Sequence, residues 1–226
     1  MTTPVYASFF KKLSLSLLVM IVLFFLCLWG VFAMADMVFE DKNLNFDDRV
    51  FDAIRPWVTQ AHTNIMLVIT FLGSQNFLLP ANILLILYYL FVRDNKKTAF
   101  QITTISVTSV AVMFGIKQLL QRQRPLVPLI SKAHGYSFPS GHTFTSVTFY
   151  GIIAYLAYRN IKNVYLRWAV IIFLTLFVIL VGFSRVYLRL HYASDVIAGF
   201  CLGLIWLILA KWILVKTEKT RLQSGL

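Results

Sequence analysis

The fold class is decided by residues 13 to 35, LSLSLLVMIVLFFLCLWGVFAMA, which run for 23 residues without a charged side chain. A helix rises about 1.5 Å per residue, so this stretch is long enough to cross the roughly 30 Å of a bilayer's hydrocarbon core. A signal peptide cleaved after Ala33-Met34-Ala35 is the alternative. The apolar region of such a peptide usually spans only about 7 to 15 residues. We therefore predict a retained first membrane span, preceded by Lys11 and Lys12.

The composition of the whole chain also points to a membrane. Its 226 residues are 59% hydrophobic and only 13% charged, with a mean hydropathy of +0.75, which excludes one soluble globular domain. The formal net charge is +12. Because the basic residues lie between apolar runs, membrane topology explains them and no nucleic-acid partner is predicted. Cys27 and Cys201 lie inside apolar runs and are predicted to be packing residues.

Further apolar stretches predict an all-α integral membrane protein, a six-transmembrane helix bundle that forms a single domain over residues 1–226. The six predicted spans are residues 13–35, 77–92, 99–120, 142–158, 168–188 and 192–215. No internal repeat or second domain interrupts them.

Two segments between the first and second spans differ from the rest. Residues 36–60 hold six acidic and three basic residues together with spaced apolar ones, which predicts an interfacial helical segment after the first span, broken near Pro56. The apolar stretch from Ala61 is interrupted by Gly73-Ser74-Gln75-Asn76. We predict a partly inserted helix before that interruption.

Charge asymmetry predicts the orientation of the six spans. Both termini share one side, where twelve basic residues face only Asp94 and Glu218. Basic loops stay in the cytoplasm, so both termini are predicted to be cytoplasmic. The opposite, extracytoplasmic side includes Asp47 and Lys132. The compact chain is typical of a bacterial inner membrane protein.

Basic and titratable residues gather at the extracytoplasmic ends of the spans. They are Lys117, Arg124, His142, Arg185 and His191. Charged groups at membrane depth are costly and usually line a polar pocket, so this pattern favours an anion site.

Three local patterns support that interpretation. Lys117 and Arg124 are seven residues apart, which predicts that they share one helix face before Pro125 ends the helix. Pro139-Ser140-Gly141-His142 is typical of a turn that opens a helix, whose free N–H groups favour a phosphate. His191 and Asp195 are four apart, so the carboxylate can orient the imidazole.

Each pattern alone has a plain structural interpretation, as a headgroup anchor, a capped turn or a surface pair. Their joint occurrence at one membrane face favours function. Five other basic residues of this face match no pattern and are predicted to be structural or interfacial: His62, Arg122, Lys132, His134 and Arg189.

Three stretches resemble the motifs of the type 2 phosphatidic acid phosphatase superfamily, which read KxxxxxxRP, PSGH and SRxxxxxHxxxD. They are KQLLQRQRP at 117–125, PSGH at 139–142 and SRVYLRLHYASD at 184–195, all complete and in order. The resemblance extends over almost the whole chain through the six-span layout.

The resemblance implies a role for each matching residue. Lys117, Arg124 and Arg185 would bind the phosphoryl oxygens, helped by Ser140 and Gly141. His191 would attack phosphorus, Asp195 would orient His191, and His142 would protonate the leaving oxygen. Three fixed cations can replace a metal clamp, and the sequence offers no carboxylate cluster for magnesium, so no metal and no other cofactor is expected.

The predicted function is dephosphorylation of a membrane lipid at the extracytoplasmic face through a phosphohistidine. A lipid phosphotransferase and a non-catalytic lipid-binding scaffold are the alternatives, whereas six spans argue against a vanadium haloperoxidase. The motifs read only the phosphate. Undecaprenyl diphosphate is favoured as the lipid, with phosphatidylglycerophosphate, phosphatidic acid and lipid A phosphate as alternatives. No pattern indicates an oligomeric state.

Overall fold

The computed structural model describes residues 5–40, 45–130 and 135–223, and every regular element in that part of the chain is a helix. This agrees with the predicted all-α class. The elements are α1 (Val5–Phe39), α2 (Asn45–Ile54), a 3-10 turn η1 (Arg55–Trp57), α3 (Gln60–Leu72), α4 (Gln75–Leu87), a π turn η2 (Tyr88–Val92), α5 (Lys96–Leu120), α6 (Gly141–Asn160), α7 (Val164–Tyr187) and α8 (Ala193–Gln223).

Five stretches within the described residues are long and apolar enough to cross a membrane. They are Leu17–Phe39, Gln60–Val92, Lys96–Leu120, Val164–Tyr187 and Ala193–Trp212. Helix α6 is long enough at 20 residues but less apolar, because its first turns carry His142, Thr143 and Ser146. The chain is therefore an integral membrane protein. The predicted span at residues 142–158, which corresponds to α6, stays a prediction, and so does the total of six spans.

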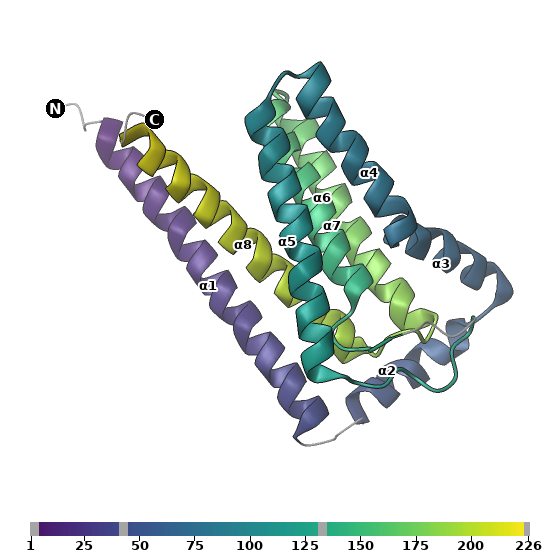
Figure 1. Ribbon diagram of the computed structural model, residues 1–226. Helices are drawn as coiled ribbons and strands as arrows, with labels where there is room; N and C mark the ends of the chain where they lie inside the picture. The colour runs from purple at the N-terminus through teal and green to yellow at the C-terminus, as the bar shows by residue number, and fades with distance from the viewer. Residues whose placement is uncertain (1–4, 41–44, 131–134, 224–226) are drawn as a thin grey trace.

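Helix α6 lies at the centre of the bundle and packs against α5, α7 and α8 (Figure 1). Its core contacts are made by Val147, Phe149 and Tyr150 against α4 and α7. Helices α1 and α8 run side by side and lean away from α5 toward the end where both chain termini lie (Figure 1). The free thiols Cys27 and Cys201 belong to these two helices.

The predicted interruption after residue 72 is a bend between α3 and α4 at Gly73 and Ser74 (Figure 1). Gly73 packs directly on α7, because a Cβ there would lie 2.3 Å from Cγ1 of Val181. Since the apolar stretch Gln60–Val92 is continuous across the bend, the predicted partly inserted helix and the second span form one bent unit.

Helix α2 crosses one end of the bundle (Figure 1). It is amphipathic, and its apolar residues Val50, Phe51 and Ile54 pack on Val186 of α7 and on Val196 of α8. The predicted amphipathic segment is confirmed in type and in its break near Pro56, although its first residues belong to α1. Its apolar face covers the bundle end that carries the motif residues.

Candidate active site

The first motif differs from its predicted geometry, because α5 ends at Leu120 and does not reach Pro125. Gln121 adopts a left-handed conformation with φ of 46°, and its N–H donates to the carbonyl of Lys117 at 3.2 Å. This closes the last helical turn four residues before the proline. The prediction that Lys117 and Arg124 share one helix face is therefore wrong: Arg124 lies in the segment after the helix.

The two cations nevertheless meet at the same loop. Lys117 Nζ donates to the carbonyl oxygen of Tyr136 at 2.6 Å, and Arg124 Nε donates to that of Gly135 at 2.9 Å. Since these carbonyls belong to successive residues, the two side chains are fixed next to each other. The segment after Gln121 thus brings Arg124 next to Lys117, which a continued helix was expected to do.

The PSGH turn caps α6. Ser140 is fully buried, and its Oγ accepts from the N–H of Thr143 at 3.5 Å and from the Thr143 hydroxyl at 3.0 Å. Both contacts use the hydroxyl oxygen as an acceptor, so they leave its O–H free to donate. The N–H groups of Gly141 and His142, in the first turn of α6, have no helical carbonyl to bond and remain available to an anion. Gly141 lies beside Lys117, whose Cε is 3.5 Å from the position of a Cβ.

Helix α8 approaches this turn unusually closely at Gly199. A Cβ at residue 199 would lie 2.8 Å from the backbone oxygen of Ser140, an atom that cannot move without displacing the turn. The N–H of Ser140 also donates to the carbonyl of Asp195 at 2.9 Å. Glycine at 199 therefore allows the second and third motifs to share one rigid contact.

His191 is almost completely buried, at 1% exposure, between Arg124 and Asp195. Its Nε2 lies 3.2 Å from Arg124 Nη1, and its Nδ1 lies 3.4 Å from Asp195 Oδ2. A guanidinium only donates and a carboxylate only accepts. The neutral imidazole that satisfies both contacts carries its proton on Nδ1 and presents the Nε2 lone pair to the cations.

Burial lowers the pKa of His191 to about 3, although the Asp195 carboxylate acts in the opposite direction. The imidazole is therefore neutral at physiological pH, as a nucleophile requires. Burial also lowers the pKa of Arg124, yet a guanidinium stays charged at neutral pH.

The carboxylate of Asp195 has three further partners. Oδ2 accepts from the hydroxyl of Ser137 and, at 2.9 Å, from the N–H of Tyr192, while Oδ1 accepts from Arg122 at 2.6 Å. Ser137 Oγ also lies 3.4 Å from His191 Nδ1. The carboxylate that faces His191 is therefore held from the loop, from the helix start and from a cation.

Sequence reasoning missed two neighbours of the motif carboxylate, Ser137 and Arg122. Arg122 is 8% exposed, and besides Asp195 it donates through Nη2 to Asp47 Oδ2 at 2.8 Å. Asp47 belongs to α2 and is fully buried, where it also accepts from the hydroxyl and the N–H of Ser194. Arg122 was predicted to be structural or interfacial. Its contacts are structural, but one of them is to the motif carboxylate.

Arg185 completes a ring of three cations. It lies in the last turn of α7, is 4% exposed and donates to the hydroxyl of Thr70 at 2.6 Å, while its buried Nε has no hydrogen-bond partner. Its charge and those of Lys117 and Arg124 all act on the imidazole of His142. Side-chain hydrogen bonds of His142 are absent from the described part of the structure. The arrangement is a cluster of three cations and two imidazoles suited to a phosphoryl group.

The other residues of this face lie outside that cluster. His62 Nδ1 contacts the carbonyl of Trp57 at 2.8 Å, and the guanidinium of Arg189 lies 5.6 Å from the ring centre of Phe51. Both contacts are structural. Lys132 and His134 lie outside the described residues. No group of three His, Cys, Asp or Glu side chains with metal-site geometry occurs among the residues that the structure describes.

Comparison with known proteins identifies the family. The sequence profile of the PAP2 superfamily matches residues 98–219, which include all three motifs. The chain belongs to the PAP2 superfamily. The predicted type 2 phosphatidic acid phosphatase relationship is thereby confirmed, and this PAP2 protein is a hydrolase of phosphate esters.

The relatives of this PAP2 chain are phosphatases. It is 31% identical over 175 residues to phosphatidylglycerophosphatase B of Bacillus subtilis, covering 74% of this chain and 80% of the relative. It is 29% identical over 118 residues to lipid phosphate phosphatase delta of Arabidopsis thaliana, covering 46% of this chain and 27% of the relative.

Two solved structures resemble the PAP2 chain in fold. The transmembrane PAP2-type phosphatidylglycerolphosphate phosphatase of Bacillus subtilis superimposes with a TM-score of 0.76 at 28% identity, covering 87% of this chain and 96% of the other. Aquifex aeolicus LpxE superimposes with a TM-score of 0.56 at 21% identity, covering 72% and 92%. The second likeness concerns the fold alone.

Proposed function

We propose that this PAP2 protein removes a phosphate from a membrane lipid through a phosphohistidine at His191, without a metal. The observation that carries the proposal is the orientation of His191. Its Nε2 faces Arg124, while its Nδ1 faces a carboxylate that Arg122 and Ser137 hold in place. A neutral imidazole in that orientation aims its lone pair at the anion pocket.

In the first step, Nε2 of His191 forms a bond to phosphorus and the bond from phosphorus to the lipid oxygen breaks. Lys117, Arg124 and Arg185 neutralise the phosphoryl oxygens, together with the N–H groups at the start of α6. His142 gives its proton to the leaving oxygen. The charge that develops on His191 is balanced by Asp195, to which the Nδ1 proton is directed.

In the second step, water attacks phosphorus, and the bond from phosphorus to Nε2 breaks. His142, now neutral, takes the proton of the attacking water. Inorganic phosphate and the starting form of the enzyme result. Ser140 keeps its predicted phosphate-binding role in this scheme, because the cap of α6 uses its hydroxyl oxygen only as an acceptor and leaves the O–H to donate.

The proposed substrate is phosphatidylglycerophosphate, because a relative of that activity shares 31% identity over 74% of this chain. Undecaprenyl diphosphate, which the sequence favoured, has no such support and is the next candidate. To rank the candidates, free phosphate released in detergent is measured for these two lipids, phosphatidic acid and lipid A phosphate. The four substrates are then compared by kcat/KM. Recovery of the phosphate on an added alcohol would indicate a phosphotransferase, and no release would indicate a scaffold.

The intermediate is tested by rapid acid-free quenching with substrate labelled in its terminal phosphate. We expect label on the protein at His191, stable to alkali and labile to acid, and none on His191→Asn. His62→Asn is the matched control, because it removes an imidazole from the surface of the same bundle end. Turnover of the wild-type enzyme with no label on the protein at any quench time would contradict the covalent route.

The site is proposed to face the extracytoplasmic side, at the inner membrane of a bacterium. Single cysteines in a variant lacking Cys27 and Cys201 test this in sealed cells. Asp47 is unsuitable as a reporter because it is fully buried, so its exposed neighbour Asp48 replaces it. We expect labelling from outside at 48 and 132, and none at 97. The reverse pattern would contradict the topology.

A further inference from the structure

A second cavity lies between α5, α6 and α8, far from the pocket of His191. Its volume is about 270 Å³, near the lower end of the roughly 300 to 1,000 Å³ typical of small-molecule sites. Lys97 lines it, twenty residues before Lys117 on the same helix. Twenty residues of helix span about 30 Å, the thickness of the hydrocarbon core, so the cavity belongs to the opposite leaflet.

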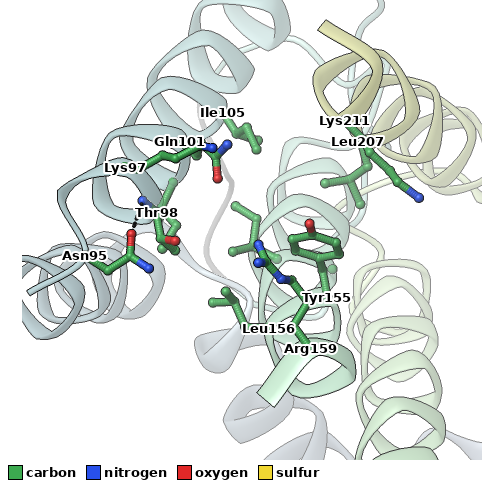
Figure 2. A pocket seen from close by; sticks show the side chains of 13 residues that line it. Asn95, Lys97, Thr98, Gln101, Ile105, Tyr155, Leu156, Arg159, Leu207 and Lys211 are labelled. Atoms are coloured by element: carbon green, nitrogen blue, oxygen red, sulfur yellow. Dashed lines mark hydrogen bonds between the residues drawn. The ribbon is translucent and has the colours of Figure 1, made fainter. Parts of the chain in front are cut away.

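The deep part of the cavity is apolar. Its walls include Ile102 and Ile105 of α5, Leu156 of α6 and Leu207 of α8 (Figure 2). Trp206 of α8 donates from Nε1 to the carbonyl of Ile105 at 3.3 Å, which ties α8 to α5 at the inner end. Beyond this tie the two helices diverge toward the chain termini (Figure 1).

The outer end of the cavity, near the start of α5 and the end of α6, is basic. Lys97, Arg159 and Lys211 line it from three different helices, and none of its lining residues is acidic (Figure 2). The guanidinium of Arg159 lies 5.8 Å from the ring centre of Tyr155, and Lys211 Nζ lies 3.8 Å from Met20 Sδ. Within the described residues, neither cation is close enough to a carboxylate to form an ion pair.

A polar group joins the basic end to the apolar part. Gln101 of α5 lines the cavity, and its side-chain amide makes no hydrogen bond to any residue that the structure describes. Its amide can therefore bond a ligand with both donor and acceptor atoms. In order from the bundle end inward, the cavity offers cations, an amide and aliphatic walls.

We propose that this cavity binds an anionic phospholipid of the leaflet opposite the catalytic pocket. The phosphodiester would lie between Arg159 and Lys211, the glycerol region beside Gln101, and the start of one acyl chain against Ile105 and Leu207. Basic pockets between membrane helices suit such headgroups. A soluble anion would leave the apolar walls unused. The lining holds no histidine or cysteine nucleophile, so the lipid is bound and not hydrolysed.

The proposal is tested with the full chain in detergent by native mass spectrometry, titrating phosphatidylglycerol against phosphatidylcholine. We expect one phosphatidylglycerol to bind and phosphatidylcholine to bind far more weakly. Arg159→Gln and Lys211→Gln should each weaken binding about fivefold, and the double variant about 25-fold. Lys162→Gln is the matched control, because it removes an exposed cation of the same bundle end that does not line the cavity. It should leave binding unchanged.

The apolar part is tested separately by Ile105→Trp, which fills the cavity. We expect it to exclude phosphatidylglycerol while phosphatase activity shows that the variant is folded. Lys117→Gln should keep phosphatidylglycerol binding, since it alters only the catalytic pocket.

Several results would overturn the proposal. They are equal binding of phosphatidylcholine, equal losses in Lys162→Gln, loss of binding in Lys117→Gln, and full competition by millimolar inorganic phosphate. A dimer that disappears in Arg159→Gln would assign the cavity to a second copy of the chain instead.

Discussion

Arg122 and Asp195 form a buried ion pair, with Nη1 2.6 Å from Oδ1, and the same guanidinium holds Asp47 of α2 through Nη2 at 2.8 Å. Both carboxylates are fully buried. One cation therefore connects the amphipathic helix to the residue that orients His191. Neither Arg122 nor Asp47 touches the pocket of Lys117, so both are positioning residues.

Arg122→Gln should lower kcat much more than it changes KM. Removal of one partner of a buried pair typically costs about 3 to 5 kcal/mol, so the melting temperature should also fall. Arg122→Lys should recover part of the stability and less of the rate, because an ammonium cannot bridge two carboxylates as a planar guanidinium does. Steady-state kinetics and thermal unfolding in detergent measure both effects.

The control for this pair lies on α2. Asp47→Asn should destabilise the protein and reduce kcat moderately, whereas Asp48→Asn changes an exposed neighbour on the same helix and should do neither. If every Arg122 variant is less stable but has an unchanged kcat/KM, the role of Arg122 is purely structural.

The two histidines should respond differently to the leaving group. His142 has no carboxylate partner like that of His191 among the described residues, and its proposed task is to protonate a poor lipid leaving group. General acid catalysis is typically worth about 10² to 10⁴ in rate. His142→Ala should therefore cripple lipid hydrolysis but harm nitrophenyl phosphate hydrolysis much less, while His191→Ala abolishes both.

The comparison requires saturating substrate, because removal of His142 also weakens phosphate binding. Equal losses of kcat on the two substrates for His142→Ala would refute its role as the general acid and leave it as a phosphate-binding residue.

Stability should decline with acid because of His191. Burial lowers its pKa from an ordinary 6.5 to about 3, so the unfolded chain binds a proton in this window that the folded chain does not. Stability is thus complete above pH 6.5 and falls as the pH drops toward 3, by at most about 1.4 kcal/mol per pH unit for one group.

His191→Gln should make this decline less steep. Melting temperatures between pH 7.5 and 4.5 check the slope, with His62→Gln as a histidine replaced at the surface. A wild-type slope in His191→Gln would show that other groups govern the acid sensitivity.

Chelators should leave turnover intact, because the phosphoryl clamp is made by Lys117, Arg124 and Arg185. Initial rates after dialysis against EDTA, with and without added magnesium, make the measurement. Vanadate should inhibit, since it takes the place of a phosphoryl group in such a pocket. Loss of activity in EDTA that magnesium restores would refute the metal-independent mechanism.

The helical class, the interruption that begins at Gly73 and the three motifs could all be recognised in the sequence, because apolar runs, glycine and ordered polar patterns are local signals. It did not predict that α5 stops at Leu120, since the left-handed conformation of Gln121 has no distinctive residue type. The expected continuation to Pro125 was reasonable from proline chemistry alone.

Long-range contacts were beyond sequence reasoning for a different reason. The bond between Arg122 and Asp47 joins residues 75 positions apart, and nothing in the spacing of either connects them. Gly199 likewise looked like an ordinary small residue in an apolar span, and only the packing of α8 on Ser140 gives it a role. The low hydropathy of α6 reflects polar side chains such as Thr145 and Thr148, whose hydroxyls bond carbonyls of their own helix.

The three cations of the pocket are anchored to the protein itself, through the carbonyls of Gly135 and Tyr136 and the hydroxyl of Thr70. A clamp assembled in advance attracts an orthophosphate as readily as the phosphate end of a lipid. We therefore expect the product to leave slowly and to compete with the substrate, which initial rates at rising orthophosphate would reveal as competitive inhibition. In a phosphate-rich medium most of the resting enzyme then holds bound orthophosphate. A lipid substrate must displace this orthophosphate before each turnover.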